Sequence, residues 1–304
     1  MRKLAFLMIG MLVACGGDEG STFKDGGDGG GGGGGGDGSD PFGNGDGGGG
    51  GDGKADSGSC LAPVDMYIMQ DRSGSMGADC NVGDTTNSKW CHSVSALAGY
   101  FSSPSAAGNA AAIQFFRVPN HSSALCATGA QYSTPLAPAG PPAYATLPTM
   151  VFNTVLNAQS PSGLTPTEAA IRGLTGFTAV NRRGGRVTIG ILVTDGDPTE
   201  CDTNLTNLSN LLQAHYMATT VRTFVIGMTG ATFANLETIA QGGNGPLHPD
   251  AIGGLTDACG NGPGPCRHWN VGDGDPKAFI AALAAIQDLS DGCKDGGGSI
   301  NPPN

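Results

Sequence analysis

Short apolar runs alternate with longer segments of helical periodicity from Cys60 onward. Four runs rich in β-branched or aromatic residues predict strands at residues 64–70, 110–118, 187–194 and 221–228. The third run is almost continuously apolar, which is typical of a central strand buried on both faces of a parallel sheet.

The segments between these runs carry apolar residues three and four positions apart, which is the spacing of an amphipathic helix. They predict helices at residues 88–102, 167–180, 205–219, 232–240 and 276–289. Asp275 followed by Pro276 is a typical helix start, and residues 135–148 are expected to be loop. Alternation of strands and helices predicts an α/β domain over residues 60–293, with a doubly wound, mostly parallel sheet flanked by helices.

The composition divides the 304-residue chain unevenly. Residues 16–59 hold 23 of the 54 glycines, nine acidic residues and two lysines, and their only large apolar side chains are Phe23 and Phe42. Such a segment cannot bury a core, so we expect a disordered linker. Residues 35–43 fit one copy of a calcium-binding β-helix repeat, but that architecture needs several stacked copies. Residues 294–304 are expected to be a disordered tail.

The N-terminus has the features of an export signal. Arg2 and Lys3 precede an apolar run that is too short to span a bilayer as a mature helix. The run ends Leu-Val-Ala-Cys15, which resembles the lipobox of bacterial lipoproteins. That resemblance implies that residues 1–15 form the signal region, with Cys15 as the lipidated first mature residue. The alternative is an ordinary signal peptide with an incidental cysteine.

The lipobox resemblance also implies a location for the protein. It predicts a cell-envelope protein anchored to the lipid bilayer, and Gly16 after the cysteine favours the outer membrane, on either face.

The formal net charge of −11 argues against a nucleic acid as partner.

Cysteine usage agrees with export. The cysteines that remain after Cys15 are even in number, which predicts four disulfides. They are Cys60, Cys80, Cys91, Cys126, Cys201, Cys259, Cys266 and Cys293. Among the possible pairings we favour Cys60 with Cys293, Cys80 with Cys91, Cys126 with Cys201, and Cys259 with Cys266. A zinc site at Cys259, Cys266 and His268 is the alternative, but no second close pair has metal-binding spacing.

The chemistry of the chain is concentrated where the predicted strands end. The first strand runs into Asp71-Arg72-Ser73-Gly74-Ser75-Met76, which places hard oxygen ligands at alternate positions. Thr165 precedes a predicted helix, and Asp195 follows the central strand. Ligands of open parallel sheets bind at the carboxyl ends of strands, so we expect all three loops at one edge of the sheet.

These three elements together resemble the metal-ion-dependent adhesion site of the von Willebrand factor A domain, also called the integrin inserted domain. The resemblance covers most of residues 60–293. It implies that a divalent cation, Mg²⁺ with Mn²⁺ or Ca²⁺ as alternatives, is held by Asp71, Ser73, Ser75, Thr165 and Asp195. The alternative is that these are turn and helix-capping residues.

An incompletely coordinated cation predicts a binding function. A protein partner would complete the shell with an aspartate or glutamate carboxylate, as in adhesion or another surface interaction. An assembly component of an envelope machine is the alternative, and a metal-dependent hydrolase is less favoured. The chain lacks G-x-S-x-G, H-E-x-x-H and G-x-x-x-x-G-K-[ST] motifs, so no catalytic residue is expected.

Several polar residues near these motifs have two interpretations. Asp197 and Glu200 would either tune the ion, or bind a second one, or be solvated loop acids, which we favour. Arg72 is expected to form a local salt bridge or contact a ligand. Residues 181–186 resemble an RNA-binding box, but they directly precede the central strand and are better interpreted as a turn. Trp90 is expected in the core.

Overall fold

The computed structural model describes residues 62–84, 86–248, 259–260 and 265–290. Within these ranges the strands form one sheet in the order β3-β2-β1-β4-β5-β6. All neighbouring strands are parallel except β3, which is antiparallel to β2. The strands are β1 (Val64–Asp71), β2 (Ala110–Phe116), β3 (Ala145–Thr146), β4 (Val187–Thr194), β5 (Arg222–Gly227) and β6 (His268–Asn270).

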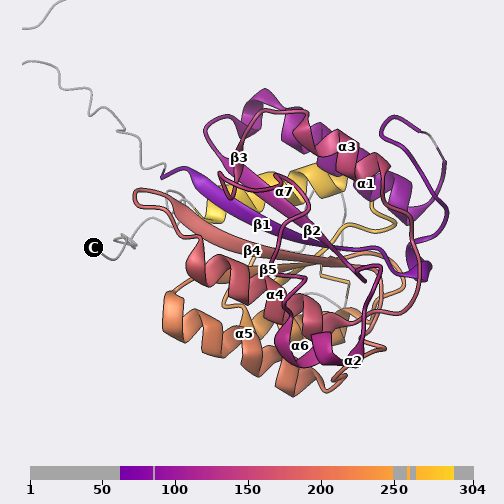
Figure 1. Cartoon of the computed structure of the whole chain (residues 1–304), viewed down its shortest axis with the longest axis vertical. Helices are drawn as coiled ribbons and strands as arrows, with labels where there is room; N and C mark the ends of the chain where they lie inside the picture. Colours follow the sequence, from indigo (N-terminus) through magenta and orange to yellow (C-terminus); the bar gives the residue numbers. More distant parts are fainter. Residues whose placement is uncertain (1–61, 85, 249–258, 261–264, 291–304) are drawn as a thin grey trace, which may run out of the picture. The chain divides into compact units, whose positions relative to one another are not determined.

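Helices cover both faces of this sheet, as Figure 1 shows. On one face lie α1 (Lys89–Ser102), α3 (Val151–Asn157) and α7 (Pro276–Ser290). On the other lie α2 (Ser123–Thr128), α4 (Thr167–Val180), α5 (Leu205–Thr219) and α6 (Phe233–Gly242). Short 3-10 turns occupy Gly74–Met76 and Pro104–Ala106. The predicted α/β class, doubly wound with a mostly parallel sheet, is confirmed.

Each face of the sheet has its own core. On β1, Met66 and Ile68 pack with the α1 and α7 side, whereas Tyr67 and Met69 pack with the α4 side. Successive side chains of a strand point to opposite faces, so a strand covered on both faces is apolar along most of its length. Trp90 lies on α1 and is fully buried in the first core, as expected.

The long elements lie where the hydrophobic pattern predicts them, with ends that differ by one or two residues. Ser88 caps α1, because its hydroxyl accepts a hydrogen bond from the Cys91 amide at 3.1 Å. Asp275 caps α7 in the same way through the Ala278 amide at 3.0 Å. Side-chain oxygens at these positions satisfy amides that have no partner within the helix.

The short elements α2, α3 and β6 were not predicted. None is longer than seven residues, which is too short for apolar periodicity to emerge. Helix α2 has no buried residue at all. The expected loop 135–148 is also interrupted, because Ala145–Thr146 pair with β2 at the edge of the sheet.

Three of the four favoured cysteine pairs are present as disulfides: Cys80–Cys91, Cys126–Cys201 and Cys259–Cys266. The zinc alternative at Cys259, Cys266 and His268 is therefore wrong for this state of the protein, because sulfurs bonded to each other are not thiolate ligands. His268 instead contacts Glu237 through Nδ1 at 2.7 Å.

Several sequence predictions lie outside the described residues. They concern the signal region, the Cys15 lipidation site, the linker with its single calcium-repeat match, the Cys60–Cys293 pair and the C-terminal tail. Within the described ranges, no helix combines the length and apolar character needed to cross a bilayer.

Candidate metal site

Two buried carboxylates lie at the carboxyl edge of the sheet. Asp71 ends β1 and Asp195 directly follows the neighbouring strand β4; their exposed fractions are 0% and 1%. The two strands are parallel neighbours, so their ends place both side chains at the same edge. Thr194 Oγ1 donates to Asp71 Oδ2 at 2.6 Å, and the Ser73 amide donates to Asp71 Oδ1 at 2.7 Å.

The two motif serines connect these carboxylates. The Oγ atoms of Ser73 and Ser75 lie 2.9 Å apart, and Ser75 Oγ donates to Asp195 Oδ1 at 2.8 Å. The loop forms a 3-10 turn over Gly74–Met76, which includes Ser75. The Gly74 amide also donates to the Gly163 carbonyl at 3.0 Å, which ties the first loop to the second.

Thr165 brings the second loop to the same place. Its amide donates to Thr199 Oγ1 at 2.9 Å, and its carbonyl accepts from the Thr199 amide at 3.1 Å. A Cβ atom placed on Gly196 would lie 3.7 Å from both Ser75 Oγ and Thr165 Oγ1. The structure therefore brings together all five residues that the sequence singled out.

The two buried carboxylates of the site would be stabilised by a further positive charge. Burial raises the pKa of Asp71 to about 7; the Thr194 hydrogen bond opposes this shift and the Asp195 charge adds to it. Asp195 Oδ2 forms an ion pair with Lys89 Nζ. Buried charges are costly unless paired, and one lysine balances only one of the two carboxylates.

The donor set suits a hard divalent cation. Two carboxylates and three neutral hydroxyls offer only oxygen, which Mg²⁺, Mn²⁺ and Ca²⁺ prefer over nitrogen or sulfur. Five protein ligands also leave at least one position of an octahedral shell for an outside group. The residues present therefore fit a metal ion with an open position.

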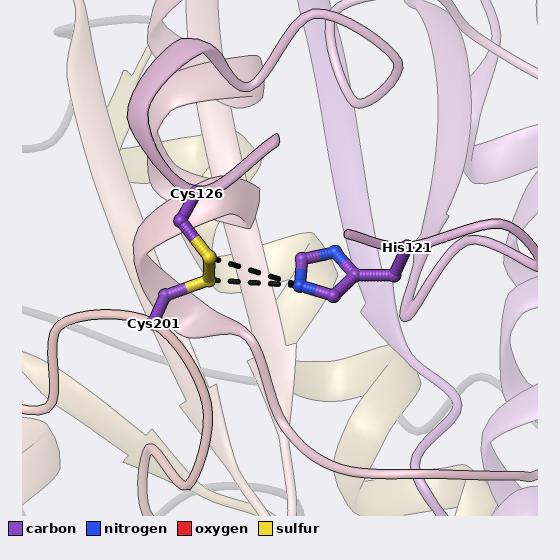
Figure 2. A group of neighbouring side chains, drawn as sticks. All are labelled: His121, Cys126 and Cys201. Carbon is purple, nitrogen blue, oxygen red and sulfur yellow. Dashed lines mark hydrogen bonds between the residues drawn. A yellow bond between two sulfur atoms is a disulfide. The ribbon is translucent and has the colours of Figure 1, made fainter. Parts of the chain in front are cut away.

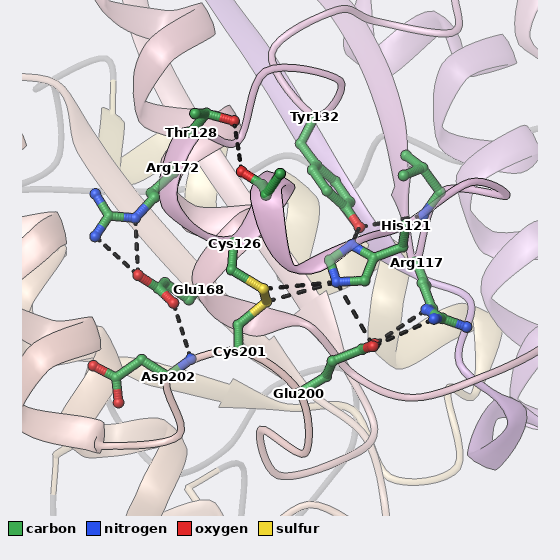
Figure 3. Close-up of a disulfide and its surroundings, with 12 residues drawn as sticks. Arg117, His121, Cys126, Thr128, Tyr132, Glu168, Arg172, Glu200, Cys201 and Asp202 are labelled. Atoms are coloured by element: carbon green, nitrogen blue, oxygen red, sulfur yellow. Dashed lines mark hydrogen bonds and ion pairs between the residues drawn. A yellow bond between two sulfur atoms is a disulfide. The ribbon is translucent and has the colours of Figure 1, made fainter.

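Asp197 and Glu200 have structural partners. Asp197 accepts hydrogen bonds from the Thr232 hydroxyl at 2.7 Å and amide at 3.2 Å, where α6 begins. Glu200 pairs with Arg117 at 3.0 Å and lies 3.8 Å from His121 Nε2 (Figure 3). Both are partly exposed loop acids, as favoured from the sequence, and each also fixes a loop.

Arg72 is also a structural residue. Its guanidinium donates to the carbonyls of Arg117 and of Ser160, the latter at 3.1 Å. These bonds hold the first loop against the end of β2 and against the segment before Thr165. The other arginine-rich stretch, residues 181–186, forms the turn that was expected before β4, and its Arg183 and Arg186 pair with the buried Asp65.

A second group of ligand-type side chains surrounds the Cys126–Cys201 disulfide. His121 Nε2 lies 3.8 Å from Cys126 Sγ and 3.7 Å from Cys201 Sγ (Figure 2). Tyr132 Oη contacts His121 Nδ1 at 2.7 Å, and burial lowers the His121 pKa. The disulfide joins α2 to the loop after Asp195. Because the two sulfurs are bonded to each other, they are not thiolate ligands for a metal in this state.

The structure adds three residues that sequence reasoning missed. Thr194 and Thr199 hydrogen-bond to Asp71 and Thr165, and Lys89 pairs with Asp195. Thr194 directly precedes Asp195, so its position at the end of a strand was a usable signal. Nothing in the spacing of Lys89 pointed to Asp195.

No protein-family model matches the chain, and no curated protein matches it. Solved structures with a similar course of the backbone include proximal thread matrix protein 1 from the mussel byssus, at 12% identity and a TM-score of 0.42. That alignment covers 76% of this chain and 49% of the mussel protein.

A second structure of the mussel protein is described as having a zinc-occupied MIDAS motif, where MIDAS abbreviates metal-ion-dependent adhesion site. It matches at 14% identity and a TM-score of 0.40, over 76% of this chain and 46% of the other. The chain thus spans about half the length of these proteins. Similarity of this degree carries no information about ligand or activity.

Proposed function

We propose that this domain binds a protein ligand through a divalent cation held by Asp71, Ser73, Ser75, Thr165 and Asp195. The observation that carries the proposal is the pair of fully buried carboxylates on adjacent strands, surrounded by hydroxyls from the first and second loops. Turn and capping roles alone explain neither the burial of both charges nor the convergence of the three loops.

The chain's own residues define what the site does. Asp71 and Asp195 bring two negative charges, and the hydroxyls bring oxygen without charge. A bound cation supplies an electrophilic centre that accepts an external carboxylate as a ligand. The bonds of Thr194 to Asp71 and of Thr199 to Thr165 hold these two residues in place, and the Gly74–Gly163 bond joins the first two loops. Fixed placement of these oxygens would leave one coordination position of a bound cation for a partner's carboxylate.

Binding rather than catalysis is supported by the hydroxyl partners. The Ser73 and Ser75 hydroxyls bond to each other, and the Ser75 hydroxyl donates to Asp195. A serine nucleophile needs a general base such as histidine within hydrogen-bonding reach. Our proposal is therefore a non-enzymatic ligand-binding domain, and with Cys15 lipidated it is a bilayer-anchored protein of a bacterial envelope. The cation we favour is Mg²⁺.

A chelator-controlled pull-down tests the proposal. Wild type, Asp71→Asn and the control Asp197→Asn are each incubated with an envelope fraction, in Mg²⁺ or in EDTA. We expect one set of partners to be retained by wild type and Asp197→Asn in Mg²⁺, and lost in EDTA and with Asp71→Asn. Equal recovery of every partner in all arms contradicts metal-dependent binding.

Cation binding is expected to weaken below pH 7. Burial raises the Asp71 pKa to about 7, so below that value a proton competes with the cation for this carboxylate. The apparent dissociation constant should rise by up to about tenfold per pH unit below about pH 7. Calorimetric titration with Mn²⁺ from about pH 8 to about pH 5.5 measures this.

In the metal-free protein the raised Asp71 pKa makes stability depend on pH, in the direction opposite to that of cation affinity. The folded state holds the Asp71 proton more tightly than the unfolded state, so the associated stability is present at low pH and is lost as pH rises through about 7. Asp71→Asn should remove this dependence. A cation affinity that stays flat across the range would show that Asp71 is not a ligand.

A further inference from the structure

Lys89 places a positive charge inside the candidate metal site. It is the first residue of α1, and its Nζ forms an ion pair with Asp195 Oδ2. The same Nζ donates to the Thr229 carbonyl at 2.9 Å. The side chain of Lys89 is 21% exposed and that of Asp195 is fully buried. The ammonium group is therefore fixed between two loops rather than free in solvent.

The position of Lys89 is unfavourable for the helix alone. A helix N-terminus carries a partial positive charge and favours acidic side chains, yet α1 has no acidic residue in its first turn. Lysine at this point therefore repels the helix dipole, and the Asp195 carboxylate offsets that repulsion. The local helix sequence gives no other reason for a cation here.

The loop after β5 is shaped around the ammonium group. Gly230 has φ +114°, and a Cβ at this residue would lie 3.1 Å from Lys89 Nζ and 2.8 Å from the Asp195 carbonyl. A side chain at residue 230 would therefore crowd the ion pair. Glycine leaves the space in which lysine and aspartate meet.

The two oxygens of Asp195 have different partners. Oδ1 accepts from Ser75, one of the proposed metal ligands, whereas Oδ2 forms the ion pair with Lys89. With both carboxylates ionised, the charges of Asp71, Asp195 and Lys89 sum to −1. A divalent cation changes that sum to +1, whereas it would give zero in the absence of the lysine.

We propose that Lys89 is a built-in competitor of the divalent cation, which stabilises Asp195 when no metal is bound, weakens cation binding, and leaves the loaded site with a net positive charge for a carboxylate ligand. This inference rests on the proposed function, because it concerns the same site. It adds a residue that sets how tightly the ion is held and how strongly the loaded site attracts an anion.

The proposal predicts opposite changes in two quantities. Lys89→Met keeps most of the aliphatic stem and removes the charge, so the metal-free domain loses its counter-charge and should melt at a lower temperature. The Asp195 carboxylate becomes fully available, so Mn²⁺ should bind about tenfold more tightly or better. Lys89→Arg keeps the charge and should stay within about threefold of the wild-type affinity.

The experiment is calorimetric titration with Mn²⁺ of chelator-treated protein, with melting curves of the metal-free forms. Lys277→Met is the matched control, because Lys277 is also in the first turn of its helix and is exposed. It should change neither quantity. If Lys89→Met folds only when Mn²⁺ is added, that result supports the proposal, and Lys89→Gln then provides the titration.

The outcomes separate this inference from the proposed function. Tighter binding by Lys89→Met together with a lower metal-free melting temperature supports both. Equal affinity of wild type and Lys89→Met overturns the role of Lys89 and leaves the metal site standing. Failure of both proteins to bind Mn²⁺ overturns the two proposals together. Binding by Lys89→Met alone supports the competition and contradicts metal binding by the natural protein.

Discussion

Replacing Asp71 with asparagine is expected to weaken cation binding at least about a hundredfold, which corresponds to about 2.8 kcal/mol. The variant removes one of the two carboxylates in a buried site, where charges interact more strongly than in water. The amide oxygen of asparagine still accepts from the Ser73 amide, a bond that is 2.7 Å long in the wild type. Titration with Mn²⁺ measures the affinity and a melting curve reports folding.

The metal-free form of this variant should be at least as stable as the wild type at about pH 8, because it buries one charge fewer. Asp197→Asn is the control, since Asp197 is near the site but bonds to Thr232. It should bind Mn²⁺ like the wild type. Full affinity in Asp71→Asn, or the same loss in both variants, would contradict the assignment of Asp71.

Removing the Cys126–Cys201 disulfide is expected to cost about 4 kcal/mol in the free energy of unfolding. The two cysteines are 75 residues apart, so the bond restricts a long loop of the unfolded chain. It also anchors the loop that contains Glu200 and Cys201 (Figure 3). The same loop carries Thr199, the partner of Thr165. Urea unfolding of Cys126→Ala/Cys201→Ala measures the loss.

The Cys80–Cys91 pair provides the comparison. These residues are 11 apart, so chain entropy predicts a smaller loss of about 3 kcal/mol for Cys80→Ala/Cys91→Ala. Cys126→Ala/Cys201→Ala should also bind Mn²⁺ more weakly, because it releases the loop after Asp195 that carries Thr199. A larger loss for the short loop than for the long one would show that packing around the sulfurs, not loop closure, dominates.

The sequence predicted the fold because long buried strands have a strong signal. The run 187–194 is almost continuously apolar and lies at the centre of the sheet as β4. Helices of 14 or 15 residues such as α4 and α5 repeat their apolar stripe several times, so their bounds were also predictable. Short elements such as α3 carry only one buried apolar pair, Phe152 and Leu156.

The convergence of the site was predictable for a related reason. Parallel strands deliver their carboxyl ends to one edge, so Asp71 and Asp195 had to be neighbours once β1 and β4 were adjacent. Lys89 was not predictable, since its contact depends on how α1 packs and on the space left by Gly230. The contact of His121 with a disulfide likewise depends on the packing of loops, for which sequence has no periodic signal.

Anomalous diffraction from crystals grown with Mn²⁺ tests the central claim most directly. We expect a peak at the carboxyl edge of the sheet, about 2.0–2.2 Å from oxygens of the Asp71, Ser73 and Ser75 shell. Thr165 and Asp195 should also contact the ion, with one position free or occupied by a carboxylate. Absence of a peak there, while Mn²⁺ binds elsewhere on the domain or not at all, would contradict the metal site.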